Sequence, residues 1–427
     1  MVTVLFVACI LLLALGVPVA FALGGATLVA MLWQGVPLVA LPKYLFSGID
    51  LFALEAVPFF ILTAELMTGG ELSAVLLRFA SQFVGRFRGG MGHTNILTLT
   101  FFSGISGSAL ADAAGPGAIM IRMMRDDGYA PPYAAALTAA TSILGPIIPP
   151  SISVIIYALA YPDVNLVGLF LAGVVPGILI AAAMAVINHM TSVRRNYRGK
   201  VQALGWNDYV RNTWRALPAL VLPALILGGI MSGAFTPTEA SVVAVFYALF
   251  AGRVLYRTLE WRMLPAILAR SALMTASVLI IVGMSAAFAW VLTVSRVPQH
   301  LTEWIVGMQL SPLAFMFAVN VLLLLFGIFI EPLPGIVVLV PILAPIAHAL
   351  GIDELQFGII VIVNLTMGMI TPPVGGLLFV TSIVARVPLA QLVRELWPFL
   401  WAQLAVLALL TLFPVLSSGL PHMLGYR

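Results

Sequence analysis

Long apolar runs separated by short polar turns cover almost the whole chain, and two of these runs are broken at their centres. The run "SILGPIIPPSISVIIY" (142–157) is apolar enough for a membrane interior, yet it contains three prolines and a glycine. A second broken run contains "GMITPP" (368–373). Proline lacks a backbone N–H and clashes with the preceding helical turn, so both patterns predict an interruption inside a membrane helix.

Composition places the chain in a membrane. Of its 427 residues, 62% are hydrophobic and 8% are charged, whereas a soluble domain has about 25% charged residues. No stretch is long and polar enough for a separate soluble domain, so we expect one integral membrane domain over 1–427, with about 10 to 14 membrane segments in the lipid bilayer. Residues 1–34 are compatible with one long span or with two short helices around Gly16–Pro18, and their apolar start lacks the basic region of a signal peptide.

Charge and cysteine content exclude other classes of protein. The net charge of +4 does not indicate nucleic-acid binding, and in a membrane protein the arginines matter as topology signals. The single cysteine, Cys9, excludes intrachain disulfides and a cysteine-based metal cluster. P-loop, HExxH and CxxC signatures are absent from the sequence, which argues against direct ATP use and zinc chemistry.

The two broken runs belong to an internal repeat. At an offset of 223 residues, glycines and a proline pair meet in register without gaps. The matched pairs are Gly104 and Gly327, Gly128 and Gly351, Gly145 and Gly368, Pro149 and Pro372, and Pro150 and Pro373. We therefore expect two structural repeats, at about 53–190 and 264–418, with linking helices at about 206–255.

Each repeat begins with a kinked pair of apolar runs, "FFSGISGSALADAAGPG" (101–117) in one and "LLFGIFIEPLPG" (324–335) in the other. Thr94 to Phe102 and Ala109 to Met120 each hold only about half a bilayer of helix. This length favours a re-entrant helical hairpin in each repeat. The alternative is a pair of kinked but complete spanning helices.

The arginines predict that the two hairpins enter from opposite faces. Arg86 and Arg88 precede the first hairpin and Arg122 and Arg125 follow it, so both of its ends are expected in the cytoplasm. Alternation along the chain then places the ends of the second hairpin, near His300 and "GIDE" (351–354), outside. Three basic residues fall on the outer side in this scheme: Lys43, Arg296 and Arg427. Inverted repeats with paired broken helices indicate a secondary transporter whose site lies near the bilayer midplane.

The first hairpin tip offers Ser103, Ser106, Ser108 and Asp112 among small residues. Hydroxyl and carbonyl oxygens suit a small cation such as sodium. The alternative is that the small residues only allow close packing and the serines bond to the preceding turn. In the second repeat the polarity has to come from Glu331, Asn364 and Thr371.

Asp112 and Glu331 are intramembrane carboxylates, and either could carry a proton or balance a cation; placement near an aqueous mouth is the simpler alternative. Backbone that is freed in lipid must line a polar cavity or bind an ion. We therefore assign substrate binding to tip and break residues together: Ser106, Ser108, Asp112, Pro149, Pro150, Ser151, Pro372 and Pro373.

A different class remains as a remote alternative. "GISG" (104–107) matches the pattern around the serine of rhomboid-type intramembrane proteases. Such an enzyme needs a histidine base beside the serine, and the five histidines all fall near predicted loops or segment ends. We therefore expect no enzymatic activity.

Five segments resemble the large membrane subunit of tripartite ATP-independent periplasmic (TRAP) transporters, the DctM family. They are "LEAVPFFILTAELM" (54–67), "SGISGSALADAAGPG" (103–117), "LGPIIPPSISVIIYA" (144–158), "FTPTEASVVAVFYAL" (235–249) and "MGMITPPVGGLLFV" (367–380). The resemblance covers nearly the whole chain, in order and with similar spacing.

The resemblance implies a multi-pass protein of the bacterial inner membrane that imports a small organic acid with a sodium gradient. It also implies two partners, a small four-helix membrane subunit and a periplasmic substrate-binding protein. The implied fold is similar to that of elevator-type ion transporters. The implied sodium sites are Ser103, Ser106 and Ser108 with Gly145, and Gly327 and Glu331 with Gly368 and Thr371.

Together, sequence and resemblance predict an all-α symporter for a carboxylate, with sodium as coupling ion and no organic cofactor. Asn364 is added to the second sodium site. Helix N-termini at the breaks and amides at the hairpin tips can hold a carboxylate without a buried arginine. The alternative is a proton-coupled carboxylate symporter that acts alone, through Asp112 or Glu331.

Overall fold

The computed structural model describes residues 1–68, 72–197 and 205–426, and every regular element in these residues is helical. Six of the helical segments are long and apolar enough to cross a membrane. They are 166–195, 206–231, 237–255, 261–294, 332–349 and 389–412. This number is smaller than the 10 to 14 segments expected, because several apolar runs are divided into shorter helices.

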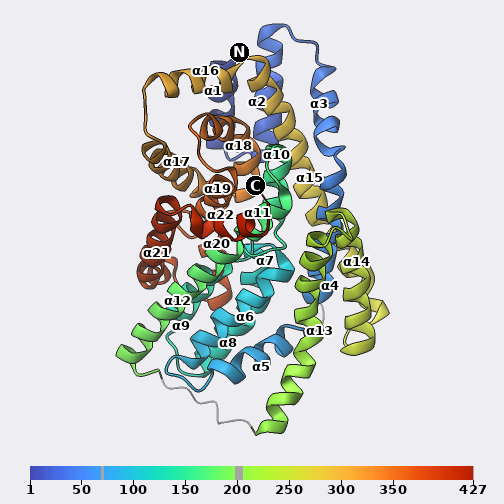
Figure 1. Cartoon of the computed structure of the whole chain (residues 1–427), viewed down its shortest axis with the longest axis vertical. Helices are drawn as coiled ribbons and strands as arrows, with labels where there is room; N and C mark the ends of the chain where they lie inside the picture. Colours follow the sequence, from blue (N-terminus) through green and yellow to red (C-terminus); the bar gives the residue numbers. More distant parts are fainter. Residues whose placement is uncertain (69–71, 198–204, 427) are drawn as a thin grey trace.

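The N-terminal region forms two helices, α1 (Val2–Ala14) and α2 (Val19–Gln34), which pack against each other. The chain turns between them at Gly16, which has a φ of +79°, and Pro18 precedes α2. Of the two possibilities for residues 1–34, the structure therefore has two short helices. Both α2 and α3 (Ala40–Ile49) pack along the long helix α15 (Leu264–Val294), as Figure 1 shows.

Two helices precede the first hairpin: α4 (Ala56–Thr68) and α5 (Leu72–Val84). Arginines and apolar residues stand at helical spacing in the segment 71–88, which predicts an amphipathic helix at the cytoplasmic interface. Its start lies outside the described residues, and α5 occupies most of the rest. This helix packs against α6 and α13, burying Val75, Leu76 and Phe79 and leaving Arg78 exposed.

The first unit, residues 90–160, comprises α6 (Gly90–Ser106), α7 (Ala109–Ala114), α8 (Pro116–Asp126), α9 (Pro131–Ser142) and α10 (Ile152–Ala160). The Ser108 hydroxyl accepts the N–H of Ala111 at 3.4 Å and so caps α7. Ser151 caps α10 in the same way, through the N–H of Val154. Residues 143–151 form the break between α9 and α10, where the proline pair stands.

The second unit, residues 312–385, repeats this order with α17 (Pro312–Gly327), α18 (Pro332–Ala349), α19 (Glu354–Gly368) and α20 (Gly376–Ala385). Residues 369–375 form its break. Asp353 caps α19 by accepting the N–H of Gln356 at 2.8 Å. The Pro149–Pro150 and Pro372–Pro373 peptide bonds are both cis. One continuous helix, α18, stands where the first unit has α7 and α8.

The hairpin arms are longer than the sequence predicted. Helix α6 has 17 residues, or about 25 Å of helix, rather than half a bilayer. It extends beyond the apolar run because polar side chains near its start find partners inside the protein. The Asn95 amide donates to Thr138 Oγ1 at 2.7 Å, and Thr94 Oγ1 donates to the Gly90 carbonyl at 2.8 Å. A helix boundary set by apolar content alone was therefore wrong here.

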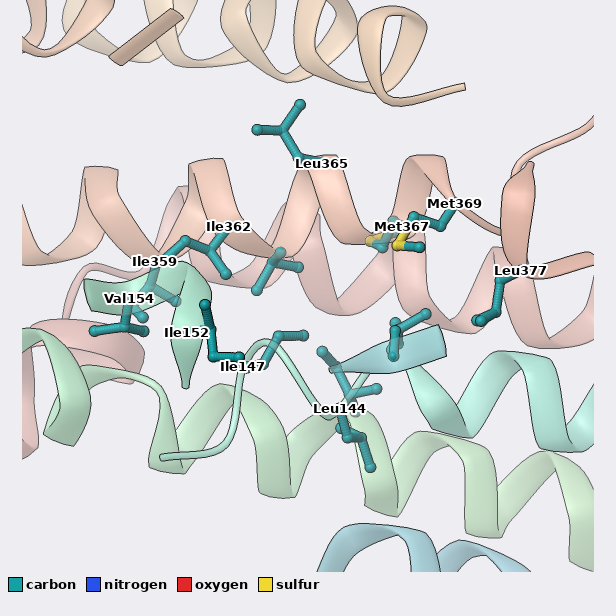
Figure 2. Packing of buried hydrophobic residues seen from close by; sticks show 14 of the residues in the cluster. Leu144, Ile147, Ile152, Val154, Ile359, Ile362, Leu365, Met367, Met369 and Leu377 are labelled. Carbon is teal, nitrogen blue, oxygen red and sulfur yellow. The ribbon is translucent and has the colours of Figure 1, made fainter. Parts of the chain in front are cut away.

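The two units interlock through their broken helices. The first half of each broken helix, α9 or α19, packs against the hairpin of its own unit. The second half packs across: α10 contacts α18, and α20 contacts α7 and α9. Figure 2 shows part of the apolar core at this crossing, with Ile152 and Val154 of α10 beside Ile359 and Ile362 of α19. The first break is thereby almost entirely buried, whereas Pro373 and Val374 of the second break remain exposed.

Further helices connect and enclose the units. They are α11 (Leu166–Ala172), α12 (Val174–Arg195), α13 (Trp206–Met231), α14 (Pro237–Phe250), α16 (Val297–Gly307), α21 (Leu389–Leu412) and α22 (Val415–Met423). Helices α13 and α14 pack together, and α14 also packs on α4. In Figure 1 the helices α4, α13 and α14 lie beside the first unit, whereas α1, α2 and α16 lie at the opposite end of the molecule.

Candidate functional site

The tip of the first hairpin is built around a buried carboxylate. Asp112 is fully buried, in the first turn of α7. Ser103 Oγ lies 3.2 Å from Asp112 Oδ2, and the Ser106 hydroxyl donates to Oδ1. The Ser108 N–H in turn donates to Ser106 Oγ at 3.3 Å. Three predicted site residues and one backbone amide therefore converge in a single hydrogen-bonded cluster.

The break of the first unit touches this cluster at Gly145. A Cβ at Gly145 would lie 2.8 Å from the Ser108 carbonyl carbon and 2.9 Å from Asp112 Oδ2. Only a glycine permits this approach of the break to the tip. Gly145 thus meets the start of α7, while a Cβ at Gly107, which follows α6, would lie 3.3 Å from the Pro150 carbonyl oxygen of the same break.

These groups fit a small hard cation. The donors are hydroxyl, carboxylate and carbonyl oxygens, the set that suits sodium. An ionised carboxylate that is withdrawn from water is costly unless a positive charge accompanies it. A cation beside Asp112 would provide that charge, and two serine hydroxyls already orient the carboxylate.

The tip of the second hairpin meets its break through backbone. A Cβ at Gly368 would lie 2.3 Å from the Gly327 carbonyl carbon, and the Gly375 N–H donates to the Ile328 carbonyl at 3.4 Å. The C-terminal ends of α17 and α19 therefore meet at this contact. Thr371 Oγ1 lies close by along the chain and donates to the Met367 carbonyl at 2.9 Å.

Asn364 is part of a separate buried chain of hydrogen bonds. Its amide donates to Asn320 Oδ1 at 2.5 Å, and the Asn320 amide donates to Thr411 Oγ1 at 2.8 Å. The Oδ1 atom of Asn364 is buried and has no hydrogen-bond partner among the described residues. The side chain does not line the cavity described next, although its helix ends at Gly368.

A cavity of about 490 Å³ lies between the two hairpin tips and the helices α4 and α15. Of the predicted site residues, Ser106, Ser108 and Glu331 line it. Glu331 precedes α18, and its side chain is exposed to this space. The cavity therefore joins the polar tip of the first unit to the carboxylate of the second.

Three helices begin at this cavity. The first residues of α7, of α10 and of α18 are among those that line it: Ala109, Leu110 and Ala111, then Ile152 and Ser153, then Pro332 and Leu333. Helix N-termini carry partial positive charge, and those of α7 and α10 also present unpaired N–H groups. In the first turn of α18 only Leu333 has an unpaired N–H, because Pro332 and Pro334 have none and the Gly335 N–H donates to the Glu331 carbonyl. The wall is otherwise mostly apolar, so it combines an apolar surface with a few places that favour an anion.

The predicted break residues do not line the cavity. Pro149, Pro150 and Ser151 are buried behind its wall, and Ser151 Oγ donates to the Pro146 carbonyl at 2.5 Å. Pro372 and Pro373 are also not part of the wall. Near the first break the cavity is lined by Pro146 and by Ile152 and Ser153 at the start of α10, and near the second break by Met369, rather than by the proline pairs.

Sequence reasoning missed several residues of the wall. Glu65 on α4, Ser153 on α10 and Ser277 on α15 all contribute to it. Glu65 lies inside an apolar run, so the rule that intramembrane carboxylates are functional could have singled it out. It forms an ion pair with Arg270, whose Nε lies 2.9 Å from Glu65 Oε2. Ser277 carries no comparable signal in the sequence.

Comparison with known proteins agrees with this architecture. The family model "Tripartite ATP-independent periplasmic transporter, DctM component" matches residues 6–416. The chain is 39% identical to the sialic acid TRAP transporter large permease protein SiaM of Vibrio cholerae, over 97% of each chain. It is 38% identical to the C4-dicarboxylate TRAP transporter large permease protein DctM of Pseudomonas aeruginosa, over 89% of each.

Among solved structures, the crystal structure of the YdaH transporter of Alcanivorax borkumensis aligns with a TM-score of 0.65. The two sequences are 16% identical, over 88% of this chain and 87% of the other. At that identity the similarity concerns the fold, which is that of a membrane transporter.

Proposed function

Because the chain belongs to the DctM component family of tripartite ATP-independent periplasmic transporters, we propose that it carries a small carboxylate across the membrane in symport with sodium. As a member of this family it is a large permease, a multi-pass protein of the bacterial inner membrane and a transporter subunit rather than an enzyme. Family membership thus excludes the protease alternative.

The convergence of three helix N-termini on one cavity is the observation that supports an anionic substrate. The N–H groups at the starts of α7 and α10 can donate to a carboxylate, the dipoles of the three helices favour its charge, and the apolar wall accommodates its carbon skeleton. The names of the relatives, for sialic acid and for C4-dicarboxylates, both specify carboxylates. We extend that class to this chain.

Sodium coupling is supported by the oxygen-rich meeting points of tip and break. The first proposed site uses Ser103, Ser106 and Ser108 with Gly145, and Asp112 supplies the negative charge. The second uses Gly327, Gly368 and Thr371, together with Glu331 and Asn364. A cation at either place would attract the substrate anion, which couples the two binding events.

The repeated order of helices supports an alternating-access mechanism. We propose that the two units are inverted repeats and move as one body, because their broken helices interlock, against a frame that includes α4 and α15. The family also implies a small membrane subunit and a periplasmic substrate-binding protein. The chain alone should therefore transport little.

Proton coupling is the second candidate, and the burial of Asp112 between two hydroxyls is the observation that favours it. The test is uptake of radiolabelled succinate and sialic acid into proteoliposomes that contain this chain, the small subunit and the binding protein, with sodium and pH gradients varied independently. Uptake that follows the sodium gradient at equal pH supports the proposal. Uptake that follows only the pH gradient would replace sodium by protons.

A further inference from the structure

The charge of the cavity wall poses a problem for a carboxylate substrate. Two carboxylates, Glu65 and Glu331, belong to the wall, and none of the described lining residues is a lysine, an arginine or a histidine. Helix N-termini offset part of this negative charge. A second source of positive charge near the path would lower the repulsion further.

Arg270 is that source. It lies on α15, four residues before Met274, which lines the cavity together with Ser277, Val278 and Ile281. Residues spaced by three or four share one face of a helix. Arg270 therefore continues the cavity face of α15 by one turn, and its contact with Glu65 places the guanidinium at the cavity edge.

The geometry of the contact leaves the arginine able to take a second anion. Glu65 accepts a hydrogen bond from the Nε–H group of Arg270. The two terminal nitrogens have no hydrogen bond among the described residues, and 54% of the Arg270 side chain is exposed, against 16% for Glu65. A guanidinium can bind a carboxylate through two parallel N–H groups, and here the two terminal nitrogens are not used by the partner that holds it.

The position of Arg270 along α15 indicates on which side of the membrane it lies. Helix α15 starts just after the basic segment 253–262, which the arginine pattern assigns to the cytoplasm. Arg270 is close to that start, so it lies on the cytoplasmic side of the cavity.

We infer that Arg270 forms a carboxylate-binding subsite at the cytoplasmic edge of the cavity, held in place by Glu65. The inference rests on the proposed function, because it assumes an anionic substrate. The substrate carboxylate moves from the helix N-termini to the guanidinium of Arg270 before release. Glu65 is a positioning residue here, since it acts through Arg270.

The test compares R270Q and R270K with R262Q in the assembled three-component transporter. Arg262 is exposed, lies near the same end of α15 and pairs with Glu260, so R262Q is a matched loss of charge away from the cavity. Proteoliposomes are loaded with radiolabelled succinate or sialic acid, and the KM and kcat for exit from the cytoplasmic face are measured. The sodium midpoint and the thermal unfolding temperature of each variant are measured in parallel.

We expect R270Q to raise this KM about tenfold, the loss of one good charged contact. R270K should raise the KM less, because it keeps the positive charge and loses only the fork geometry of the guanidinium. In both variants kcat and the sodium midpoint should stay near wild type, and R262Q should have a wild-type KM. E65Q, which frees the guanidinium, should change the KM in the same assay without changing the sodium midpoint.

Two results would overturn the inference while the proposed function stands: an unchanged KM in R270Q, or an equal increase in R262Q. A wild-type transporter that moves neither succinate nor sialic acid with sodium would remove the proposed function and this subsite together. If R270Q unfolds, R270K decides, and a wild-type KM in R270K would count against the guanidinium.

Discussion

The two hairpin tips meet their broken helices in different ways. In the first unit Gly145 meets the backbone of Ser108 and also a carboxylate, that of Asp112, whose oxygens are bound by Ser103 and Ser106. In the second unit Gly327 and Gly368 meet backbone to backbone. The carboxylate of the second tip, Glu331, faces the cavity instead.

This difference separates two roles that a symporter needs. A buried carboxylate with hydroxyl neighbours suits a cation and is poorly placed for an anionic substrate. A glycine contact between two helix C-terminal ends can hold a cation through backbone carbonyl oxygens alone, which leaves the nearby side chain free to face the substrate. The same order of helices therefore supports different chemistry, and each role can be tested by substitutions that compare the two tips.

The largest effect is expected from bulk at the backbone contact. In Gly368→Ala the new methyl group would meet the Gly327 backbone, which cannot rotate away, and overpacking of this kind costs about 1–3 kcal/mol. We expect uptake to be lost and the thermal unfolding temperature to fall. Gly376→Ala is the control, since a Cβ there has nothing within 4 Å. Wild-type uptake in Gly368→Ala would show that the second tip is not closed as the structure has it.

The next effect concerns the two carboxylates. Asp112→Asn removes the charge and one acceptor from the buried cluster, and a charged hydrogen bond of this kind contributes about 1.5–3 kcal/mol, or roughly ten- to hundredfold in affinity. We expect the sodium concentration for half-maximal uptake to rise by that factor. Glu331→Gln should instead change mainly the KM for substrate.

The comparison between the tips would fail if Glu331→Gln raised the sodium midpoint as much as Asp112→Asn. Two results together would favour proton coupling through one of these carboxylates. A pH gradient would drive uptake in the wild type, and the variant of that carboxylate would lose this uptake while its sodium midpoint stayed unchanged.

A smaller effect is expected from single hydroxyls of the first tip. Ser106→Ala removes one oxygen from the cluster and leaves Gly145 and the break in place, so the sodium midpoint should rise several-fold while the protein still folds. Ser108→Ala removes the side-chain cap of α7, and this loss lowers stability by about 1 kcal/mol. The variant should therefore change the unfolding temperature more than the sodium midpoint. Equal sodium midpoints in wild type and Ser106→Ala would remove this hydroxyl from the proposed site.

The sequence predicted the breaks and tips because proline pairs and glycines leave a local signature. The offset search placed Gly145 and Gly368 at corresponding positions, and both have close contacts to their own hairpin tip in the structure. Alignment by glycine worked because a backbone approach of this kind tolerates no side chain. Family membership, inferred from five motifs, was confirmed by the match over residues 6–416.

The walls of the cavity were harder to predict. Glu65 and Ser277 come from α4 and α15, far apart in the sequence, and they meet the tips only through tertiary packing. The proline pairs were assigned to the substrate, whereas the structure buries Pro149 and Pro150 behind the first residues of α10. Sequence spacing identifies where a helix is interrupted, but not which side of the interruption faces the cavity.

The smallest effect is expected from the hydrogen bonds that buried asparagine side chains form in the two units. Asn95 donates to Thr138 in the first unit, and Asn320, which is bonded to Asn364, donates to Thr411 beside the second. Thr138→Val and Thr411→Val keep the side-chain volume and remove one acceptor each.

Hydrogen bonds between membrane helices contribute about 0.6 kcal/mol on average, so both variants should unfold at slightly lower temperature and transport normally. The informative quantity is the sodium midpoint. Thr138 lies more than one helical turn before the first break and should leave the midpoint unchanged. Thr411→Val would leave it unchanged too if the second site depends on backbone, because the chain of amides is then only structural. A shift in Thr411→Val alone, reproduced in Asn364→Ala, would instead make the unpaired Oδ1 of Asn364 a sodium ligand and give the second unit a side-chain oxygen of its own.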